Sequence, residues 1–273
     1  MKKNHLIIKN LILLIFFFHS CSKPNKAVTE SNFSTKYVFA SRGLNIRSKS
    51  NLNSEIIGKI PDKVLINLKI SDSDQQDEIE NIEGSWRNIT FNHVNGFIFD
   101  GYTSSTIPPD GNCDNLQVYL DKYFKKTKSI KYLSVVGSHY NPEEKVYETR
   151  TFYENGIEFF NYNLTEGSMD CIQAHNLSLT ELFLIGKRCF GVKTNNIKYP
   201  LSKNFNYINN VFKYEDIHYE KTIVQHYTDN KKDIPWNTIQ INIENTFYSP
   251  ENKYINLWLI TEPIRAICLG GTM

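Results

Sequence analysis

The sequence predicts a mostly β protein with two domains: a small all-β domain at residues 36–104 and an α+β domain at residues 112–273, in which an antiparallel sheet carries two helices. Three observations predict this fold class. Short alternating segments fill residues 37–104, and no window there supports a helix of ten residues. The segment STIPPDG, residues 105–111, has the Pro pair and Gly typical of a linker. Beyond it, two amphipathic helical patterns lie among strand-like segments.

Short apolar runs separated by polar turns predict the strands of the first domain. They lie at residues 37–40, 44–47, 56–60, 64–70, 86–91 and 96–99. In a small barrel of five or six strands, alternation turns one set of side chains inward and the other toward solvent. The inward set is predicted to be Leu44, Ile46, Ile57, Ile60, Ile66, Leu68, Ile89 and Ile98.

The second domain is predicted from two helices and a set of strands. A helix over about residues 114–126 places four apolar side chains on one face. In the helix over residues 178–190, Ser178 and Glu181 form a capping box, and Gly191 marks its end. The dipeptide Asn155-Gly156 predicts a hairpin. Strands are expected at residues 130–136, 147–153, 157–162, 168–174, 207–212, 217–227, 238–247 and 254–261.

The first 20 residues carry the pattern of a secretory leader. Three lysines precede an apolar run at residues 11–18, which is shorter than the roughly 18 residues that cross a bilayer. Removing residues 1–20 takes away three lysines and no acidic residue, which leaves 28 basic and 29 acidic side chains. This balance provides no basic surplus for binding nucleic acid, so no nucleic-acid partner is expected.

Ser20 and Cys21 follow the apolar run, and this order resembles the lipobox of bacterial lipoproteins. Phe18 and His19 replace the usual Leu and small residue, so the match is closer to the looser lipoboxes of spirochaetes. The resemblance implies a lipid-modified Cys21 and an exported protein anchored by lipid in the bacterial cell envelope. A polar segment, residues 21–35, would be a flexible tether. The alternative is a plain signal peptide with an incidental cysteine.

Four further cysteines, Cys113, Cys171, Cys189 and Cys268, are disulfide candidates. An even number in an exported protein favours one or two disulfides, but four cysteines allow three pairings, and the sequence does not choose among them. None forms a C-x-x-C motif, so a redox or zinc site of that type is not expected.

The stretch GLNIRSKSNLNSEIIGKIP (residues 43–61), followed by VLINLKI and WRNITFNHVNGFIFDGYTS, resembles the bacterial SH3 domain. The family pattern has Leu-Asn-Val-Arg-Ser, a polar turn, Val-Ile-Gly, a strand, a Trp, and a closing Gly-Trp-Val with a Tyr. Here Leu44 to Ser48, Ile56 to Gly58, Trp86, Gly96 and Tyr102 stand at those places, with Phe97 for the closing Trp. The resemblance covers about a quarter of the chain and implies an SH3-like barrel at residues 36–104.

The family often binds cell-wall peptide or another envelope ligand, and the resemblance implies that role for this domain. Trp86, Phe99 and Tyr102, joined by Tyr37, are the candidate ligand-binding aromatic residues. The alternative is that Trp86 and Phe99 are core packing, since so small a domain needs its aromatic residues for burial. The expected partners are therefore a peptidoglycan peptide or an envelope protein, with the membrane reached through Cys21.

An acidic insertion, SDSDQQDEIENIEG at residues 71–84, precedes Trp86. Six of its side chains match ligand positions of an EF-hand loop, namely Asp72, Asp74, Gln76, Glu78, Glu80 and Glu83. Asp77, however, stands where the tight turn needs Gly, and strands rather than helices flank the loop. The insertion is therefore interpreted as a solvated acidic loop, and no metal or cofactor is predicted.

Two alternatives to a non-enzymatic binding protein stay open. Bacterial SH3 domains often accompany NlpC/P60-type cysteine peptidases, and Cys171 with His218 and His226 downstream is the candidate set for an envelope peptidoglycan hydrolase. That family has its Cys at the start of a helix, whereas Cys171 lies in a strand-like segment, so the device that lowers a thiol pKa is missing. The other alternative is a surface interaction protein in which the barrel is a spacer.

Overall fold

The computed structural model describes residues 33–71, 74–111, 113, 116–135, 145–164, 167–189, 197–203, 206–209, 211–214, 217–228, 231–243, 255–262 and 264–272. The predicted leader, Cys21 and residues 21–32 of the predicted tether lie outside these ranges. Within them, no helix combines the length and the apolar character that a membrane crossing requires. Residues 33–273 form one compact unit.

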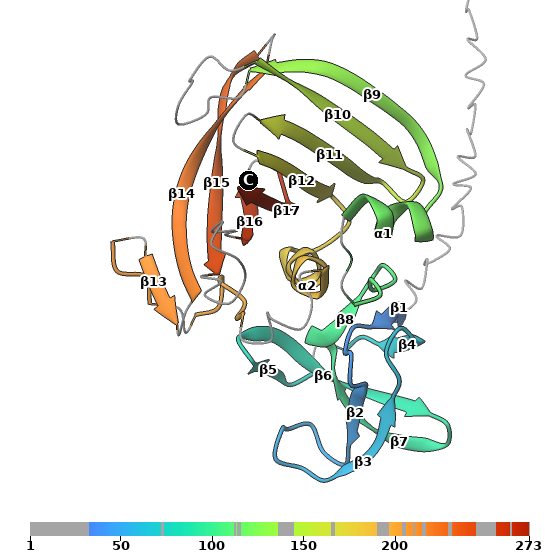
Figure 1. Ribbon diagram of the computed structural model, residues 1–273. Helices are drawn as coiled ribbons and strands as arrows, with labels where there is room; N and C mark the ends of the chain where they lie inside the picture. The colour runs from blue at the N-terminus through green and yellow to red at the C-terminus, as the bar shows by residue number, and fades with distance from the viewer. Residues whose placement is uncertain are drawn as a thin grey trace, which may run out of the picture. The chain divides into compact units, whose positions relative to one another are not determined.

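Residues 33–104, called here the N-terminal β-region, form two antiparallel sheets (Figure 1). One sheet has the strand order β4-β1-β8 and the other β3-β2-β7-β6-β5. A 3-10 turn, η1 (Asp100–Tyr102), joins β7 to β8. The strands are β1 (Phe33–Val38), β2 (Leu44–Arg47), β3 (Ile56–Ile60), β4 (Leu65–Lys69), β5 (Gln76–Ile79), β6 (Ile82–Phe91), β7 (Val94–Phe99) and β8 (Thr103–Ser104). Strand β1 therefore begins inside the segment that was predicted to be a tether.

The two sheets enclose an apolar core. It consists of Val38, Leu44, Ile46, Ile60, Ile66, Leu68, Ile89 and Ile98, so the alternation of the strands predicts most of it. Ile57 is the exception, because its side chain is 38% exposed. The pairing of β2 with β3 shifts after Ile46, which lies opposite Gly58, so that Arg47 lies opposite Ile56. Ile57 and Ile60 are three positions apart, so alternation turns their side chains to opposite faces of β3, and only Ile60 faces the core.

The acidic insertion is a hairpin rather than a solvated loop. Strand β5 pairs with the first half of β6, and Glu80 and Asn81 form the turn with positive φ angles of 52° and 68°. Two such residues match the twist of a tight hairpin. Ile82 is buried in the main core, and the Asn81 amide donates to the Ser202 hydroxyl at 3.1 Å. Apolar anchoring and this hydrogen bond explain why so acidic a segment is ordered.

Residues 105–272, the C-terminal region, contain a nine-stranded antiparallel sheet among the described residues, in the order β13-β14-β15-β16-β17-β12-β11-β10-β9. The sheet is strongly curved (Figure 1), and β9 meets β14 at Val135 and Ser134, but this contact covers two residue pairs and the sheet is not closed. The elements are α1 (Leu116–Tyr123), β9 (Lys126–Val135), β10 (Lys145–Tyr153), β11 (Ile157–Leu164), β12 (Gly167–Ala174), α2 (Leu179–Cys189), β13 (Val211–Tyr214), β14 (Ile217–Thr228), β15 (Lys231–Ile243), β16 (Ile255–Glu262) and β17 (Ala266–Thr272).

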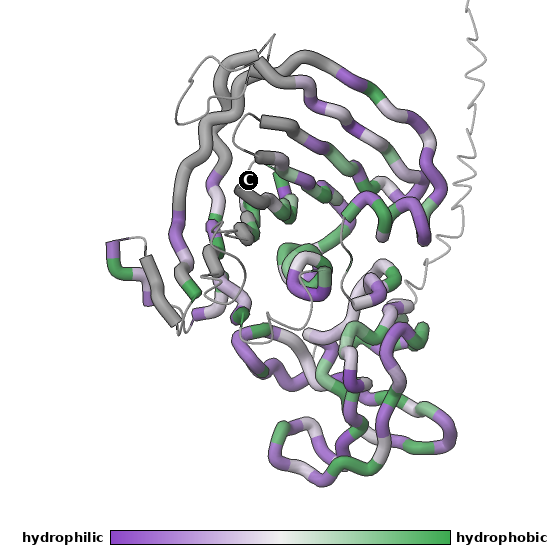
Figure 2. The backbone as a smooth tube through the Cα atoms, viewed as in Figure 1, coloured by the Kyte–Doolittle hydropathy of each residue, from purple (hydrophilic) through white to green (hydrophobic). Residues whose placement is uncertain are grey.

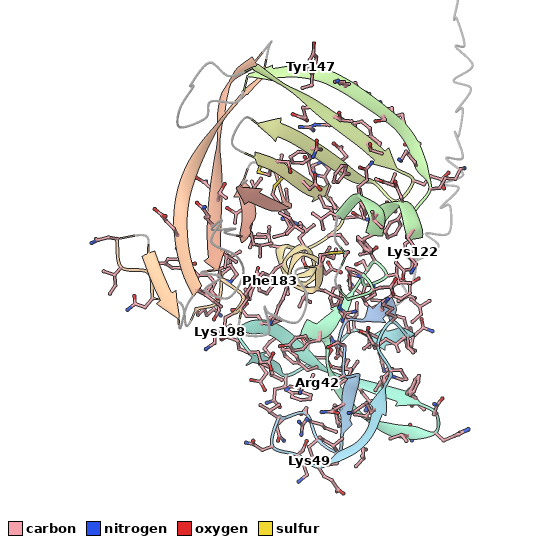
Figure 3. All side chains as sticks on the ribbon, viewed as in Figure 1. Arg42, Lys49, Lys122, Tyr147, Phe183 and Lys198 are labelled. Carbon is pink, nitrogen blue, oxygen red and sulfur yellow. A yellow bond between two sulfur atoms is a disulfide. The ribbon has the colours of Figure 1, made fainter. Side chains whose placement is uncertain are left out.

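Helix α2 lies against one face of this sheet, and most of its residues are buried. Figure 2 shows the helix as largely hydrophobic, and Phe183, labelled in Figure 3, is fully buried against Tyr199 at a ring separation of 5.3 Å. Gly186 allows the closest approach, since a Cβ there would lie 2.7 Å from Ile267 and 2.9 Å from Leu257. The absent side chain thus sets how near α2 can lie to β16 and β17.

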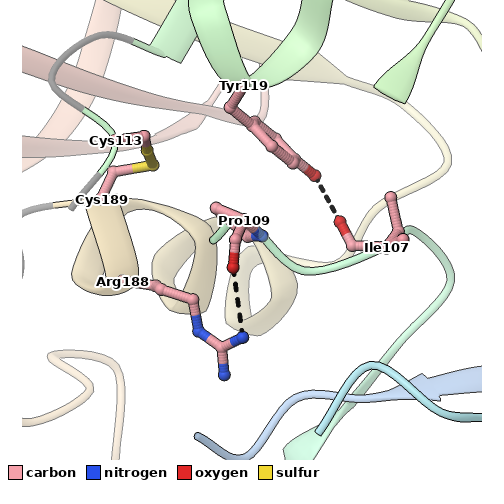
Figure 4. Close-up of a disulfide and its surroundings, with 6 residues drawn as sticks. All are labelled: Ile107, Pro109, Cys113, Tyr119, Arg188 and Cys189. Carbon is pink, nitrogen blue, oxygen red and sulfur yellow. Dashed lines mark hydrogen bonds between the residues drawn. A yellow bond between two sulfur atoms is a disulfide. The ribbon is translucent and has the colours of Figure 1, made fainter. Parts of the chain in front are cut away.

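One core joins the two regions. Phe39, Ile82, Trp86 and Phe99 of the N-terminal β-region belong to the same cluster as Leu182 and its neighbours on α2. The predicted linker, residues 105–111, is packed within this arrangement: Thr106 is 5% exposed, and the Tyr119 hydroxyl donates to the Ile107 carbonyl at 2.7 Å (Figure 4). The division into two domains stays a prediction.

At the level of fold class, the described residues are mostly β with two α-helices, which agrees with the prediction of a β-rich chain; the SH3-like barrel and the separate α+β domain stay predictions. The helices expected at residues 114–126 and 178–190 are found as α1 and α2, while residues 114, 115 and 190 lie outside the described residues. The capping box is confirmed, because Ser178 and Glu181 exchange side-chain to backbone hydrogen bonds at 2.8 and 3.1 Å. The strand predicted at residues 207–212 lies at Val211–Tyr214 instead.

Candidate functional site

A pocket of about 840 Å³ lies where the N-terminal β-region meets α2. The loop between β1 and β2, the hairpin β5–β6, the end of β7 with η1, and the last turn of α2 all contribute to it. The lining residues are Phe39, Ala40, Ser41, Arg42, Gly43, Leu44, Asn45, Arg47, Leu52, Ile79, Glu80, Trp86, Phe99, Tyr102, Gly111, Leu184, Lys187 and Arg188. We call this the interface pocket.

Three of the four aromatic residues predicted to bind ligand line the interface pocket: Trp86, Phe99 and Tyr102. Trp86 and Phe99 are 2% and 3% exposed and belong to the core that also contains α2, so they form a buried floor, as the core-packing alternative predicts, and not an open aromatic surface. Tyr37 is not among the lining residues. It lies on β1, opposite Leu65 of β4 and Ser104 of β8.

The aromatic floor is held by the hairpin that the acidic insertion forms. The Trp86 indole N–H donates to Asp77 Oδ2 at 3.0 Å, and its ring lies 5.8 Å from that of Phe99. The Tyr102 hydroxyl donates to Glu80 Oε2 at 2.8 Å. Burial, with the Glu80 carboxylate beside it, raises the pKa of Tyr102 above its usual value of 10.0, so its hydroxyl stays a donor into the alkaline range.

The part of the pocket lining that comes from the end of α2 contains Arg188. Its guanidinium donates to both oxygens of Asp62, at 2.8 and 3.0 Å, and to the Pro109 carbonyl at 3.3 Å (Figure 4). It also lies 4.3 Å from the centre of the Phe39 ring, close enough for a cation–π interaction. The disulfide between Cys113 and Cys189 follows directly along the helix. Arg188 therefore fixes α2 to the N-terminal β-region at the pocket.

Glu181 is a second link between α2 and the N-terminal β-region. One carboxylate oxygen caps the helix at Ser178, and the other accepts from the Ser105 N–H at 2.5 Å and from Lys36 Nζ at 3.3 Å. Burial alone would raise the pKa of Glu181. The backbone donors of Ser178 and Ser105, together with Lys36, outweigh burial and hold this pKa below its usual value of 4.5.

Replacing Glu181 by Gln should therefore destabilise the protein in a pH-dependent way. We expect a loss of about 1–2 kcal/mol near pH 7, from the cap and the bonds to a buried carboxylate. Because the folded pKa is depressed, this stabilisation is fully present above about pH 4.5 and is lost as the pH falls through the folded pKa. Urea unfolding of both proteins between pH 7 and 3 measures the difference.

A suitable control is Glu154→Gln, since the Glu154 side chain is 55% exposed and pairs with Lys125 at the surface. This change should cost less than about 0.5 kcal/mol at every pH. A Glu181 effect that stays constant from pH 7 to 3 would contradict the assignment.

The four candidate cysteines form two disulfides, Cys113–Cys189 and Cys171–Cys268. The second links directly opposed positions on β12 and β17, and both of its cysteines are fully buried. A thiolate nucleophile is not available at Cys171 in this oxidised state. His218 and His226 lie on β14, which pairs with β13, β15 and β9 and not with β12.

The described residues contain no group of three or more metal-ligating side chains. Of the six EF-hand positions, Asp72 lies outside the described residues, and Asp74 is paired with Arg87. The Ser202 hydroxyl donates to Glu78, and Glu80 accepts from Tyr102. These carboxylates serve the hairpin and its contacts.

Sequence reasoning missed the basic side of the interface pocket. Arg42, Lys187 and Arg188 were not predicted, and neither was Leu184. Lysine and arginine in the last turn of a helix are ordinary partners of the helix dipole, so nothing in the local pattern marks them as lining residues. The approach of α2 to the loop after β1 is a tertiary feature.

Comparison of the chain with protein-family models, curated proteins and solved structures found no match. The fold and the pocket define a disulfide-bonded, mostly β protein with an aromatic and basic pocket between a small β-region and a helix on a curved sheet.

Proposed function

We propose that this chain is a non-enzymatic envelope protein, lipid-anchored through Cys21, whose SH3-like module at residues 36–104 binds cell-wall peptide. The observation that carries the binding proposal is the interface pocket, which is lined by Trp86, Phe99 and Tyr102 and by the apolar side chains of Leu52 and Leu184. Concave sites with aromatic walls and a few polar groups are typical ligand sites.

The module itself is supported by the order of the sequence motifs and by two small antiparallel sheets that enclose one core. The anchor is supported by the lipobox-like order that ends at Cys21. The disulfides favour an oxidising compartment, as an exported protein would meet.

The two alternatives have less support. A peptidase using Cys171 would need a free thiolate, and Cys171 is cross-linked to Cys268. A barrel that serves only as a spacer would not be expected to share its core with α2, as Trp86 and Phe99 do.

Co-sedimentation with purified peptidoglycan tests the proposal. The chain from residue 21, with Cys21→Ser to prevent lipidation, should sediment with peptidoglycan, and Leu52→Ser should weaken retention by about tenfold through the lost apolar contact. Leu65→Ser is the matched control, since Leu52 and Leu65 are 48% and 52% exposed and only Leu52 lines the pocket. Absence of retention for the parent chain would rule out cell-wall binding.

A further inference from the structure

The sheet β4-β1-β8 exposes apolar side chains at the end where β1 begins and β4 ends, and Figure 1 shows these two strands side by side. Phe33, the first residue of β1, is 59% exposed, and Ile70, which follows β4 directly, is 46% exposed. The register places Phe33 opposite the exposed Lys69, and directly opposed side chains of an antiparallel pair share one face. We call Phe33, Lys69 and Ile70 the sheet-end patch.

The outer face of the sheet continues from this patch toward the middle of β1. Tyr37 and Leu65 are directly opposed on it, and Leu65 is 52% exposed. Thr35 and Asn67 form the row between, where the Thr35 hydroxyl donates to Asn67 Oδ1 at 3.0 Å. None of the residues in these rows is acidic. The outer face is therefore apolar or neutral, with a single cation at the sheet-end patch.

The sheet-end patch lies close in the sequence to the proposed lipid anchor. Phe33 is twelve positions after Cys21. A chain spans at most about 3.6 Å per residue, so Phe33 lies within about 43 Å of an anchored Cys21. Confinement so near a membrane gives the patch an effective concentration on the order of millimolar at the lipid surface. Apolar contacts too weak to bind a free protein then suffice to hold the anchored chain.

We propose that the sheet-end patch docks on the lipid surface to which Cys21 is anchored, with Phe33 and Ile70 in the interfacial layer and Lys69 among the headgroups. Aromatic side chains are favoured at membrane interfaces, and a lysine buries its apolar stem while its ammonium group reaches the headgroup phosphates. Binding strength at such a surface grows with the apolar area that is buried. This inference rests on the proposed function, from which it takes the lipid anchor.

A lipid surface fits the patch better than a protein partner does. Phe33, Leu65 and Ile70 together provide less area than the roughly 800 Å² per partner that a stable protein interface buries. A bilayer, in contrast, needs no complementary shape, and the covalent anchor already holds the two surfaces near each other. The short segment between Cys21 and Phe33 thus favours the membrane as the surface that covers the patch.

Quenching of an introduced tryptophan by brominated lipid tests the inference. The chain from residue 21 is coupled through Cys21 to a maleimide lipid in vesicles with brominated acyl chains, since the other four cysteines form disulfides. Phe33→Trp should be quenched beyond the parent, because bromine acts only at close range. The control is Ile208→Trp, at a position that precedes β13 and is 70% exposed. It should be quenched no more than the three native tryptophans of the parent.

A second change tests whether the patch itself makes the contact. Ile70→Asp, added to Phe33→Trp, should lower the ratio of docked to undocked protein by at least about tenfold, since an apolar contact is lost and a carboxylate would have to leave water. The additional quenching should then disappear. Ile208→Asp in the same background makes the same chemical change outside the patch and should leave the quenching unaltered.

The outcomes separate docking from the proposed function. Equal quenching of Phe33→Trp and Ile208→Trp would overturn the docking inference, as would equal losses from the two Asp changes. A dimer of the Cys21→Ser chain that Ile70→Asp abolishes in sedimentation velocity would assign the patch to a second copy and would also overturn it. The maleimide lipid supplies an anchor in every case. Mass spectrometry of the chain expressed with residues 1–20 decides separately whether Cys21 is lipidated, and an unmodified Cys21 would contradict the proposed function.

Discussion

Replacing Asp62 by Ala should lower the free energy of unfolding by about 3 kcal/mol, because it leaves the Arg188 guanidinium without its carboxylate partner. The Arg188 side chain is 10% exposed, and Asp62 provides both oxygens to it. Asp62 also accepts from the Ala40 N–H at 3.0 Å, in the loop that borders the interface pocket. The change thus leaves a largely buried cation unpaired and removes a hydrogen bond that holds the loop between β1 and β2. Denaturant unfolding of the variant measures the loss.

Two further variants distinguish a stranded charge from simple loss of packing. Asp62→Ala combined with Arg188→Met should be more stable than Asp62→Ala alone, since no unpaired cation remains. Glu154→Ala removes the partner of Lys125, whose side chain is 76% exposed, and should cost less than about 1 kcal/mol. Equal costs for the Asp62 and Glu154 variants would contradict the role assigned to the Arg188 pair.

Local sequence patterns predicted the features that depend on interactions between residues close in the sequence. Ser178 and Glu181 predicted the cap of α2 because both bonds of a capping box lie within one helical turn. The same pattern could not predict that the second oxygen of Glu181 accepts from Ser105 and Lys36. Those contacts depend on how the two regions pack together, and a short stretch of sequence carries no information about that packing.

Strand alternation predicted most of the core of the N-terminal β-region. Ile57 is the exception, because it lies three positions from the buried Ile60 and a strand turns two such side chains to opposite faces. The acidic insertion was also mispredicted. Its charge suggested solvent, whereas Ile79 and Ile82 flank a Glu80-Asn81 turn and anchor a hairpin.

The sequence predicted the aromatic residues of the candidate site but not its basic residues. Trp86 and Tyr102 could be found because they stand in the SH3-like sequence pattern, and Phe99 because it follows directly on the Gly96-Phe97-Ile98 segment of that pattern. Lys187 could not be predicted, because it lines the pocket from α2, a helix that the resemblance does not cover. The pairing of cysteines is similar: once β12 and β17 are neighbours, Cys171 and Cys268 stand opposite each other, and three possible pairings become one.

Replacing both Cys171 and Cys268 by Ala should lower the free energy of unfolding by about 4–5 kcal/mol, the chain-entropy value for a long closed loop. The two residues are 97 positions apart in the sequence and fully buried, so their loss also leaves space in a packed cluster with Phe160, Ile260 and Ala266. Denaturant unfolding without reductant measures the effect, with the exposed Ser168→Ala of the same strand as control.

The single variant Cys171→Ala should lose nearly as much stability as the double variant, because either change removes the cross-link. If both variants unfold at the same denaturant concentration as the parent chain, the disulfide does not stabilise the fold. The single variant also tests the peptidase alternative. A muropeptide-cleaving activity that is present in the parent and lost in Cys171→Ala, but retained in Cys268→Ala, would require a free Cys171 thiolate and would overturn the non-enzymatic proposal. Equal behaviour of the two single variants is what a structural cross-link predicts, since its two sulfur atoms have the same role.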